Sequence, residues 1–166
     1  MVLISGWSLL FKKHHINQFL YRPGSAEARG GRHFLLLKQF RGKFMLYVFR
    51  PELLRKSLSE PAARKLLARY GYPENGGIGS LICHLSSRFD SCGGFPHEIG
   101  IFLDYPPEDV EGFIINKGRN SKLTRAWKVY GDVNRAQERF AILDACREFV
   151  SSAFRNGASI GYLAKA

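Results

Sequence analysis

The fold is decided by the stretch Phe95-Pro-His-Glu-Ile-Gly-Ile-Phe-Leu-Asp-Tyr-Pro-Pro-Glu-Asp-Val-Glu-Gly-Phe-Ile114, which holds two apolar segments led by prolines. Proline suits the first turn of a helix, because the N–H that it lacks would have no partner there. Acidic residues follow the prolines, and their charge complements the positive end of a helix. The stretch therefore predicts two short helices, His97–Leu103 and Pro107–Ile115, separated by a tight turn.

Downstream of this pair, we expect a basic glycine turn, a strand and a long helix. The turn is Lys117-Gly-Arg-Asn120 and the strand is Ala126–Tyr130. Asp132 is a typical helix N-cap, and Gly157 suits a helix end because glycine readily adopts a positive φ. Between them, apolar residues at helical spacing predict one inner stripe, made of Ala136, Phe140, Leu143, Cys146, Val150 and Phe154.

Upstream of the pair, the clearest signal is a β-hairpin. His33–Phe40 and Phe44–Arg50 are rich in aromatic and aliphatic residues, and they flank the turn Arg41-Gly42-Lys43. The glycine supplies the backbone freedom that a tight hairpin turn needs. Two paired strands are therefore expected here.

Three helices are expected between the hairpin and the proline-led pair. The first begins at Pro51, the second covers Pro61–Arg69 with Ser59 as its N-cap, and the third covers Ser80–Phe89. Their helical spacing predicts inner faces made of Ala62, Leu66 and Leu67 in the second helix and of Leu81, His84 and Leu85 in the third.

This order of elements contains no alternating βαβ run. It is typical of an α+β fold, here a small and mostly antiparallel sheet, made of the hairpin and one further strand, with helices packed on it and a long amphipathic helix at the C-terminal end. We expect a single domain over residues 33–166, preceded by an atypical, poorly ordered lead-in over residues 1–32.

Composition indicates a globular protein of the cytoplasm. The chain has 166 residues, of which 45% are hydrophobic, enough for a core of its own. Its three cysteines, an odd number, indicate a reducing compartment, with Cys83 and Cys146 expected in the core. No positive charge precedes the apolar N-terminal run, as a secretory signal requires, and no stretch reaches the roughly 18 apolar residues of a membrane span.

Positive charge is concentrated in the first part of the chain. Residues 1–70 hold 14 Lys and Arg against 3 Asp and Glu, whereas residues 71–166 hold 11 of each. A one-sided basic field favours nucleic acid, anionic lipid or an acidic protein as partner, although a basic face can also serve solubility alone. The expected docking residues are Lys38, Arg41, Lys43, Arg50, Arg55 and Lys56, with Lys117 and Arg119 of the glycine turn as further binding candidates.

Several segments together carry a family resemblance. They are Leu46-Tyr-Val-Phe-Arg-Pro-Glu52, Phe95-Pro-His-Glu-Ile-Gly-Ile-Phe-Leu103, Tyr105-Pro106 with Asp109-Val110 and Gly112-Phe113-Ile114, Asn116-Lys-Gly118 and Trp127-Lys-Val-Tyr-Gly131. On these segments the chain resembles, from about His33 to Leu163, a bacterial family catalogued as domain of unknown function 3793. Cys146 also falls where that family tends to carry a cysteine. The resemblance implies no reaction, ligand or catalytic residue, because the family has no established activity.

The chain departs from this family in two places. Family members usually open with a longer helical segment that contains a His-Cys pair, which the first 32 residues do not resemble. Where they often have Cys-Gly-Tyr, this chain has Thr124-Arg125-Ala126. Any redox or metal chemistry of those cysteines would be lost here.

A thiol or redox enzyme is one alternative function. Cys92 lies in a glycine turn ahead of a helix N-terminus, with His97 and Glu98 close in sequence, and such a setting can lower a thiol pKa. Cys83, His84, Cys92 and His97 lack the spacing of a metal site, so no metal is expected, and no other cofactor either.

Binding of single-stranded nucleic acid through the basic aromatic hairpin is the other alternative, whereas Trp127 and Tyr130 are expected to serve core and edge packing more than base stacking. A DNA-binding helix-turn-helix over Ile99–Ile114 is disfavoured, because its second helix begins with carboxylates that would face phosphates. The glycine turns Gly76–Gly79 and Asn116–Asn120 suit anions but match no phosphate-loop motif. We therefore expect a non-catalytic binding or accessory protein whose basic N-terminal half docks an acidic protein; its oligomeric state is left open.

Overall fold

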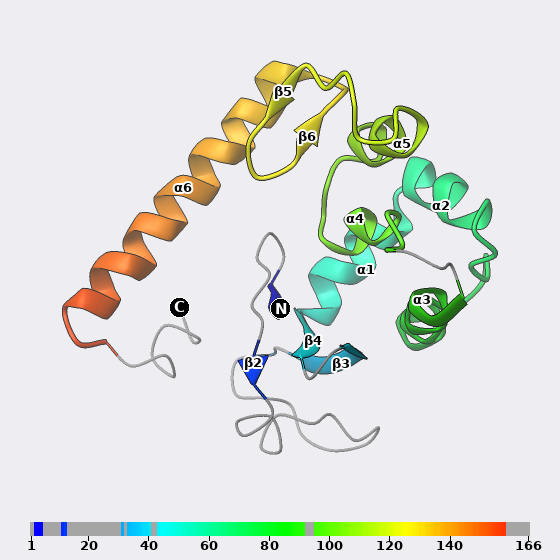
Figure 1. Ribbon diagram of the computed structural model, residues 1–166, viewed down its shortest axis with the longest axis horizontal. Helices are drawn as coiled ribbons and strands as arrows, with labels where there is room; N and C mark the ends of the chain where they lie inside the picture. The colour runs from blue at the N-terminus through cyan, green and yellow to red at the C-terminus, as the bar shows by residue number, and fades with distance from the viewer. Residues whose placement is uncertain are drawn as a thin grey trace.

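The structure, a computed structural model of the chain, describes residues 2–4, 11–12, 31, 33–40, 43–91 and 95–158. The fold class is α+β, as predicted (Figure 1). The strands are β1 (Val2–Ile4), β2 (Phe11–Lys12), β3 (His33–Phe40), β4 (Lys43–Phe49), β5 (Leu123–Thr124) and β6 (Lys128–Val129). The helices are α1 (Pro51–Ser59), α2 (Pro61–Ala68), α3 (Ile78–Ser91), α4 (Ile99–Phe102), α5 (Pro107–Ile115) and α6 (Val133–Arg155). Most of the expected lead-in, residues 1–32, lies outside the described residues.

The main sheet is built around β4. The predicted hairpin is confirmed: β3 runs antiparallel to β4, from the pair His33–Phe49 to the pair Phe40–Lys43. A bulge between Leu36 and Lys38 shifts the register in the middle of β3. The short strands β1, parallel, and β2, antiparallel, also pair with β4. The further strand that we expected in this sheet is β6, which pairs instead with β5 in a separate two-stranded ladder.

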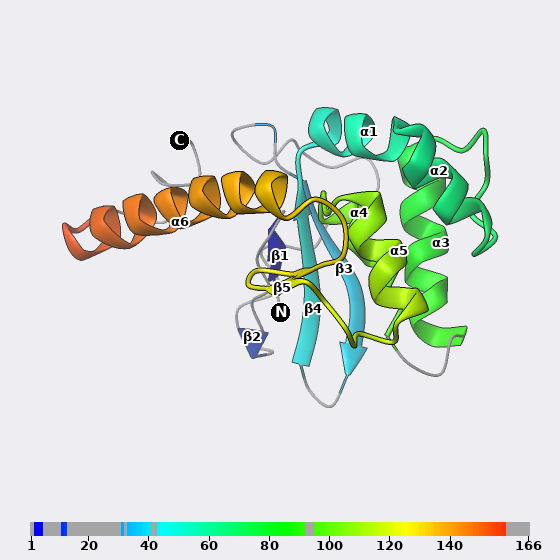
Figure 2. The same ribbon diagram turned by 90° about the horizontal axis from the view of Figure 1, so that it is seen from above.

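Helices α1 to α5 gather on one side of the hairpin (Figures 1 and 2) and enclose the main core. The sheet is tied to them by Tyr47 of β4, whose hydroxyl donates a hydrogen bond to the carbonyl oxygen of Phe102 at 2.6 Å. The sheet and all five helices contribute fully buried side chains, among them Tyr47, Leu54, Leu66, Leu85, Ile101 and Val110. Burial of these apolar groups is the main stabilising contribution.

Three of the short helices, α1, α2 and α5, begin at a proline, whereas α4 is shorter than the predicted His97–Leu103 and begins at Ile99. α1 begins at Pro51 and α5 spans Pro107–Ile115, both as predicted. The N-cap of α2 is Glu60 and not Ser59, because Ser59 still belongs to α1. The inner face of α2 also differs by one position: Ala63 is buried and Ala62 is exposed.

α3 is longer than predicted and buries a stripe that includes Leu81 and Leu85. His84 is half-buried, and its Nε2 lies 2.9 Å from the carbonyl oxygen of Tyr70. The prediction that Cys83 belongs to the core is wrong: it is exposed. Its position follows the buried Ile82 and points to the solvent side of the helix.

A second, smaller core joins the β5–β6 ladder to the first half of α6. It contains Trp127, Val129, Ala136 and Phe140, all buried. The predicted N-cap of α6 is confirmed, because the carboxylate of Asp132 accepts hydrogen bonds from the backbone N–H groups of the second and third residues of the helix.

The second half of α6 leaves the body of the protein (Figures 1 and 2). The expected inner stripe is correct for Ala136, Phe140 and the partly buried Leu143, and wrong for Cys146, Val150 and Phe154. Cys146 is exposed, and Phe154 is 59% exposed. Helical spacing places these residues on neighbouring faces but says nothing about whether another element covers them. The turn after the helix includes Gly157 with φ of 84°, as predicted.

None of the helices in the described part of the chain combines the length and the apolar character that a membrane span requires.

Candidate partner-docking surface

Exposed basic residues lie on α1 and α2, a surface that only partly overlaps the hairpin and α1 residues expected from the sequence. Lys56 of α1 and Lys65 of α2 occupy the solvent side of their helices, opposite buried leucines, and both are exposed. Arg50, just before α1, is exposed as well. None of these three side chains forms an ion pair with a described carboxylate. Their charge is therefore available to a partner.

Two of the expected docking residues are engaged within the protein. Lys38 donates a hydrogen bond to the carbonyl oxygen of Phe89 and lies 3.3 Å from the carboxylate of Asp90. Arg55 pairs with Glu52 at 2.7 Å one helical turn away, a solvent-exposed pair that contributes little to stability. Both side chains therefore have lower priority as docking residues.

The two remaining expected residues, Arg41 and Lys43, lie at the turn of the hairpin and at the start of β4. Arg41 lies outside the described residues. Lys43 is the first residue of β4 and pairs with Phe40. Both remain predictions.

A shallow cleft of about 250 Å³ adjoins the basic surface at α2. Arg64 and Lys65 stand on its α2 side, and Leu58, Leu67 and Tyr72 provide apolar lining. Arg64 also donates to the carbonyl oxygen of Glu74 at 3.1 Å, which holds the loop after α2 against the helix. Positive groups beside an apolar cleft suit a ligand that carries both a carboxylate and an apolar side chain. Lys65 was not among the docking residues expected from the sequence, and the loop that completes the cleft was not predictable from helical spacing.

The basic turn after α5 forms a second positively charged site. Lys117 and Arg119 are exposed and form no ion pair among the described residues. Two hydrogen bonds fix the turn. Lys128 donates to the carbonyl oxygen of Gly118 at 2.6 Å, and the Tyr130 hydroxyl donates to the carbonyl oxygen of Arg119 at 3.0 Å. Lys117 has a φ of 51°, an uncommon value for a residue with a side chain.

This turn belongs to the same group of helices as α2. α2 and α5 pack side by side, and Arg69 at the end of α2 pairs with Glu111 of α5 (Figure 1). The structure therefore connects the basic helices and the basic turn through α5. The phosphate-type alternative for this turn is weakened, since the N–H groups of residues 116–119 all donate to backbone carbonyl oxygens.

Two residues of the suggested thiol site, His97 and Glu98, lie among the described residues, and each has different partners. Cys92 lies outside the described residues. His97 is exposed and packs edge-on against Phe113, with 4.9 Å between ring centroids. Glu98, by contrast, is 1% exposed, and its carboxylate accepts from Arg88 Nε at 2.7 Å and, more weakly, from the Tyr72 hydroxyl at 3.4 Å. Glu98 therefore links α3 to the turn before α4 and does not orient His97.

Of the aromatic residues that the structure describes in the hairpin and around β6, two are buried, and the burial of Trp127 agrees with the packing role expected for it. Tyr47 is 1% exposed, and Trp127 is 7% exposed between Tyr105 and Phe140. Tyr130 is half-buried, with its hydroxyl bound to the basic turn. The first two rings are not available to a nucleobase.

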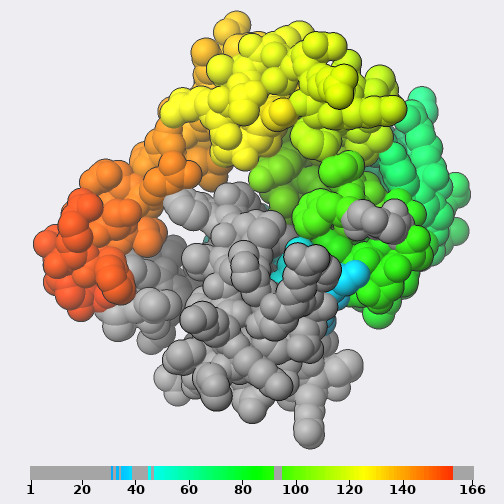
Figure 3. All heavy atoms as spheres, viewed as in Figure 1, coloured from blue at the N-terminus to red at the C-terminus, as the bar shows by residue number. Residues whose placement is uncertain are grey.

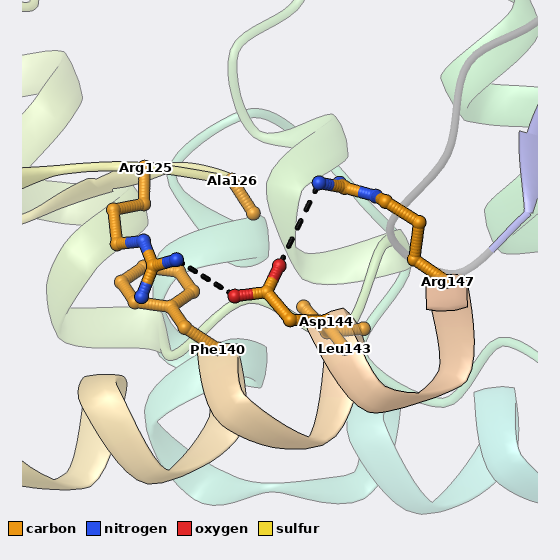
Figure 4. Close-up of a pocket in the computed structure, with 6 residues that line it drawn as sticks. All are labelled: Arg125, Ala126, Phe140, Leu143, Asp144 and Arg147. Carbon is orange, nitrogen blue, oxygen red and sulfur yellow. Dashed lines mark hydrogen bonds and ion pairs between the residues drawn. The ribbon is translucent and has the colours of Figure 1, made fainter. Parts of the chain in front are cut away.

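A second pocket, of about 210 Å³, lies between the β5–β6 turn and α6 (Figure 4). Arg125 lies over the ring of Phe140, and Asp144 bridges Arg125 at 2.7 Å and Arg147 at 3.6 Å. Because one carboxylate already neutralises part of this arginine pair, the pocket is a weaker anion site than the basic helices. Within the described residues, no three His, Cys, Asp or Glu side chains come together as metal ligands.

These features define a small α+β protein with a basic, cleft-bearing helical surface. The chain belongs to the family described as "Protein of unknown function (DUF3793)", whose family model matches residues 9–164. The resemblance found in the sequence is thus confirmed, and the match begins earlier than the expected start near His33. No curated protein and no solved structure matches the chain.

Proposed function

We propose that this protein is a non-catalytic binding protein of the cytoplasm and that its α1–α2 surface docks an acidic segment of a partner protein. The observation that carries the proposal is the pair Lys56 and Lys65, two exposed lysines on consecutive helices with no carboxylate partner among the described residues. Exposed unpaired charges contribute to solubility, and toward an acidic partner they also provide directed electrostatic attraction.

The local charge balance supports an acidic partner. Residues 50–69 contain six basic residues, Arg50, Arg55, Lys56, Arg64, Lys65 and Arg69, against two acidic residues, Glu52 and Glu60. Only Arg55 and Arg69 of this segment form ion pairs with described carboxylates. The other basic side chains of this segment form no ion pair with a described carboxylate and therefore give the surface a net positive charge.

The cleft beside α2 supports a protein partner with mixed chemistry. Its lining combines Arg64 and Lys65 with the leucines Leu58, Leu67 and Leu81. Carboxylates of the partner would contact the basic side chains, and an apolar side chain of the partner would enter the cleft. Apolar anchors of this kind provide most of the affinity in protein interfaces, while charge pairs provide specificity and speed of association.

A protein partner is favoured over single-stranded nucleic acid by the burial of Tyr47 and Trp127. Sequence-tolerant binding of single strands depends on exposed aromatic rings beside a positively charged groove. The basic helices provide the charge without such rings. Nucleic-acid binding stays an alternative for the same surface, to be separated by experiment.

The test is a titration of labelled acidic peptides followed by fluorescence anisotropy. We expect a glutamate-rich peptide with one central leucine to bind more tightly than the same peptide with glutamate at that position, because only the first can fill the cleft. Lys56→Glu and Lys65→Glu should each weaken binding about tenfold.

The matched control is Arg135→Glu, which makes the same change in net charge away from this surface. Arg135 is exposed in the first turn of α6, where an acidic residue is tolerated by the helix dipole. Equal weakening by all three substitutions would mean that only net charge matters. Such a result would overturn the proposed surface.

A further inference from the structure

The second half of α6 presents an apolar face without a described cover. Ile142 is 64% exposed, Phe149 58%, Val150 46% and Phe154 59%. Ile142, Cys146, Phe149 and Ala153 follow one another at steps of three or four residues, so they form one stripe along the helix. Val150 and Phe154 widen the stripe on one side. Exposed apolar patches of this extent on a single protein usually mark an interaction site.

No charged residue falls on the line of Ile142, Cys146, Phe149 and Ala153, whereas Arg147 lies one turn before Val150, at the edge of the widened side. Asp144, Glu148 and Arg155 lie on the opposite side of the helix, where Glu148 and Arg155 pair with each other at 3.0 Å. A face of this composition does not suit the acidic partner proposed for α1 and α2, nor a nucleic acid. It suits an equally apolar helix.

We propose that the stripe is covered by the same stripe of a second copy of this chain, with the two α6 helices antiparallel. The register that follows from side-chain size aligns Cys146 of one copy with Phe149 of the other. The same alignment then places Ile142 opposite Ala153. Each large side chain meets a small one, which lets the two helices interdigitate at normal packing density.

A parallel pair lacks this match. It would place Phe149 against Phe149 and Ala153 against Ala153, so that one layer is crowded and another is empty. A parallel pair would also bring together the two bodies, each of which belongs to a chain with a net charge of +11. The antiparallel pair places the bodies at opposite ends of the paired helices, which reduces their repulsion.

The size of the face is adequate for a weak to moderate dimer. Ile142, Phe149, Val150 and Phe154 together expose on the order of 400 Å² of apolar surface per copy. The two copies would therefore cover roughly 800 Å² from these residues alone, and the small residues between them bring the total toward the roughly 1,000 Å² of a specific interface. Figure 3 shows the distal half of α6 standing out to one side of α1 to α5.

The first experiment is measurement of molar mass by light scattering across a range of protein concentrations, on the full chain. We expect a transition from the 18.8 kDa of one chain to twice that mass as the concentration rises. Phe149→Glu, which introduces a charge in the middle of the stripe, should raise the dissociation constant about 100-fold.

The matched control is Gln137→Glu, which introduces the same side chain on the opposite, exposed face of the same helix. It should leave the dissociation constant within about twofold, which corresponds to the usual effect of an exposed surface substitution. Circular dichroism of both variants verifies that α6 is still formed. Equal effects of the two substitutions, or a wild-type chain that stays monomeric at every concentration, would overturn the proposal; the second result would point to a cover supplied by the chain itself.

The register has a test of its own in a background in which all three cysteines are replaced by serine. Ile142→Cys and Ala153→Cys are prepared separately, mixed and oxidised. We expect disulfide-linked dimers mainly in the mixture, because the register pairs position 142 of one copy with position 153 of the other. Dimers that form equally well from either variant alone would contradict the antiparallel arrangement.

Discussion

At the scale of single residues, Asp109 connects parts of the chain that the sequence does not bring near one another. It is 3% exposed in α5, and its carboxylate accepts three hydrogen bonds at 2.7 Å, from the Trp127 indole N–H and from the backbone N–H groups of Tyr130 and Gly131. The carboxylate thus fixes the end of β6 against α5. The sequence assigned this acidic residue to the helix N-terminus alone, because its partners lie 18 or more positions away.

Asp109→Ala should be among the most damaging substitutions in the protein. It leaves one buried and two partly buried donors without an acceptor, and we expect a loss of about 3–5 kcal/mol in the free energy of unfolding, measured by urea denaturation. Asp109→Asn retains one acceptor oxygen and should lose less. The neighbouring exposed residue provides the control: Glu108→Gln, 3.8 Å from Arg135, should change the free energy by less than about 0.5 kcal/mol. Similar losses for the two positions would contradict the role of Asp109.

Tyr47 predicts a dependence of stability on alkaline pH. Burial, and secondarily the nearby carboxylate of Asp104, raises the pKa of the Tyr47 hydroxyl well above its ordinary value of 10.0 in the folded protein. The unfolded chain loses this proton near pH 10 while the folded chain retains it. The contribution is therefore fully present below about pH 10 and declines as the pH rises further, by up to about 1.4 kcal/mol per pH unit.

Tyr47→Phe tests this dependence in urea denaturation at about pH 8 and about pH 11. At the lower pH the variant should be less stable by about 1 kcal/mol, because the carbonyl oxygen of Phe102 loses its donor. At the higher pH the difference should shrink. Part of the alkaline decline should remain, since burial also raises the pKa of Tyr105. A constant difference between the two proteins would contradict the assignment.

At the scale of elements, the hairpin and the short helices were predictable because local rules decide them. Proline at a first helical position set the start of α1, α2 and α5, and the aromatic runs set β3 and β4. The β5–β6 ladder was only half predicted, since two-residue strands show no alternation. The extension of α6 beyond the body was missed because spacing identifies a common face and not its cover.

The packing of α5 against β6 depends on a glycine. A Cβ atom at Gly112 would lie 2.4 Å from Cβ of Tyr130, which is too near the backbone to swing away. Gly112→Ala should therefore lower the free energy of unfolding by roughly 1–3 kcal/mol. Gly79→Ala is the matched control within α3, where no atom lies within 4 Å of an added Cβ; it should raise stability by roughly 0.5–1 kcal/mol. Thermal unfolding of the two variants should show shifts of opposite sign, and shifts of the same sign would refute the packing argument.

At the scale of the whole molecule, the charge count predicted where positive charge would gather but not which charges would remain available. Lys38 and Asp90 are 52 positions apart in sequence, so their pairing follows only from the fold. Lys65, which the sequence did not single out, lines the cleft together with Arg64. The proposed docking surface therefore includes α2 and gives lower priority to Lys38 and Arg55, which are paired within the protein. His97 and Glu98 of the thiol alternative have separate partners.

The most direct test of the docking account compares two probes of equal charge and similar length on the wild-type protein: a glutamate-rich peptide with a central leucine and a single-stranded oligonucleotide. Affinities are measured by anisotropy at low and at moderate salt. The account predicts tighter binding of the peptide, and a loss of this preference in the double variant Lys56→Glu/Lys65→Glu. Tight binding of the oligonucleotide together with no detectable binding of the peptide would contradict it and would indicate that the basic surface binds nucleic acid.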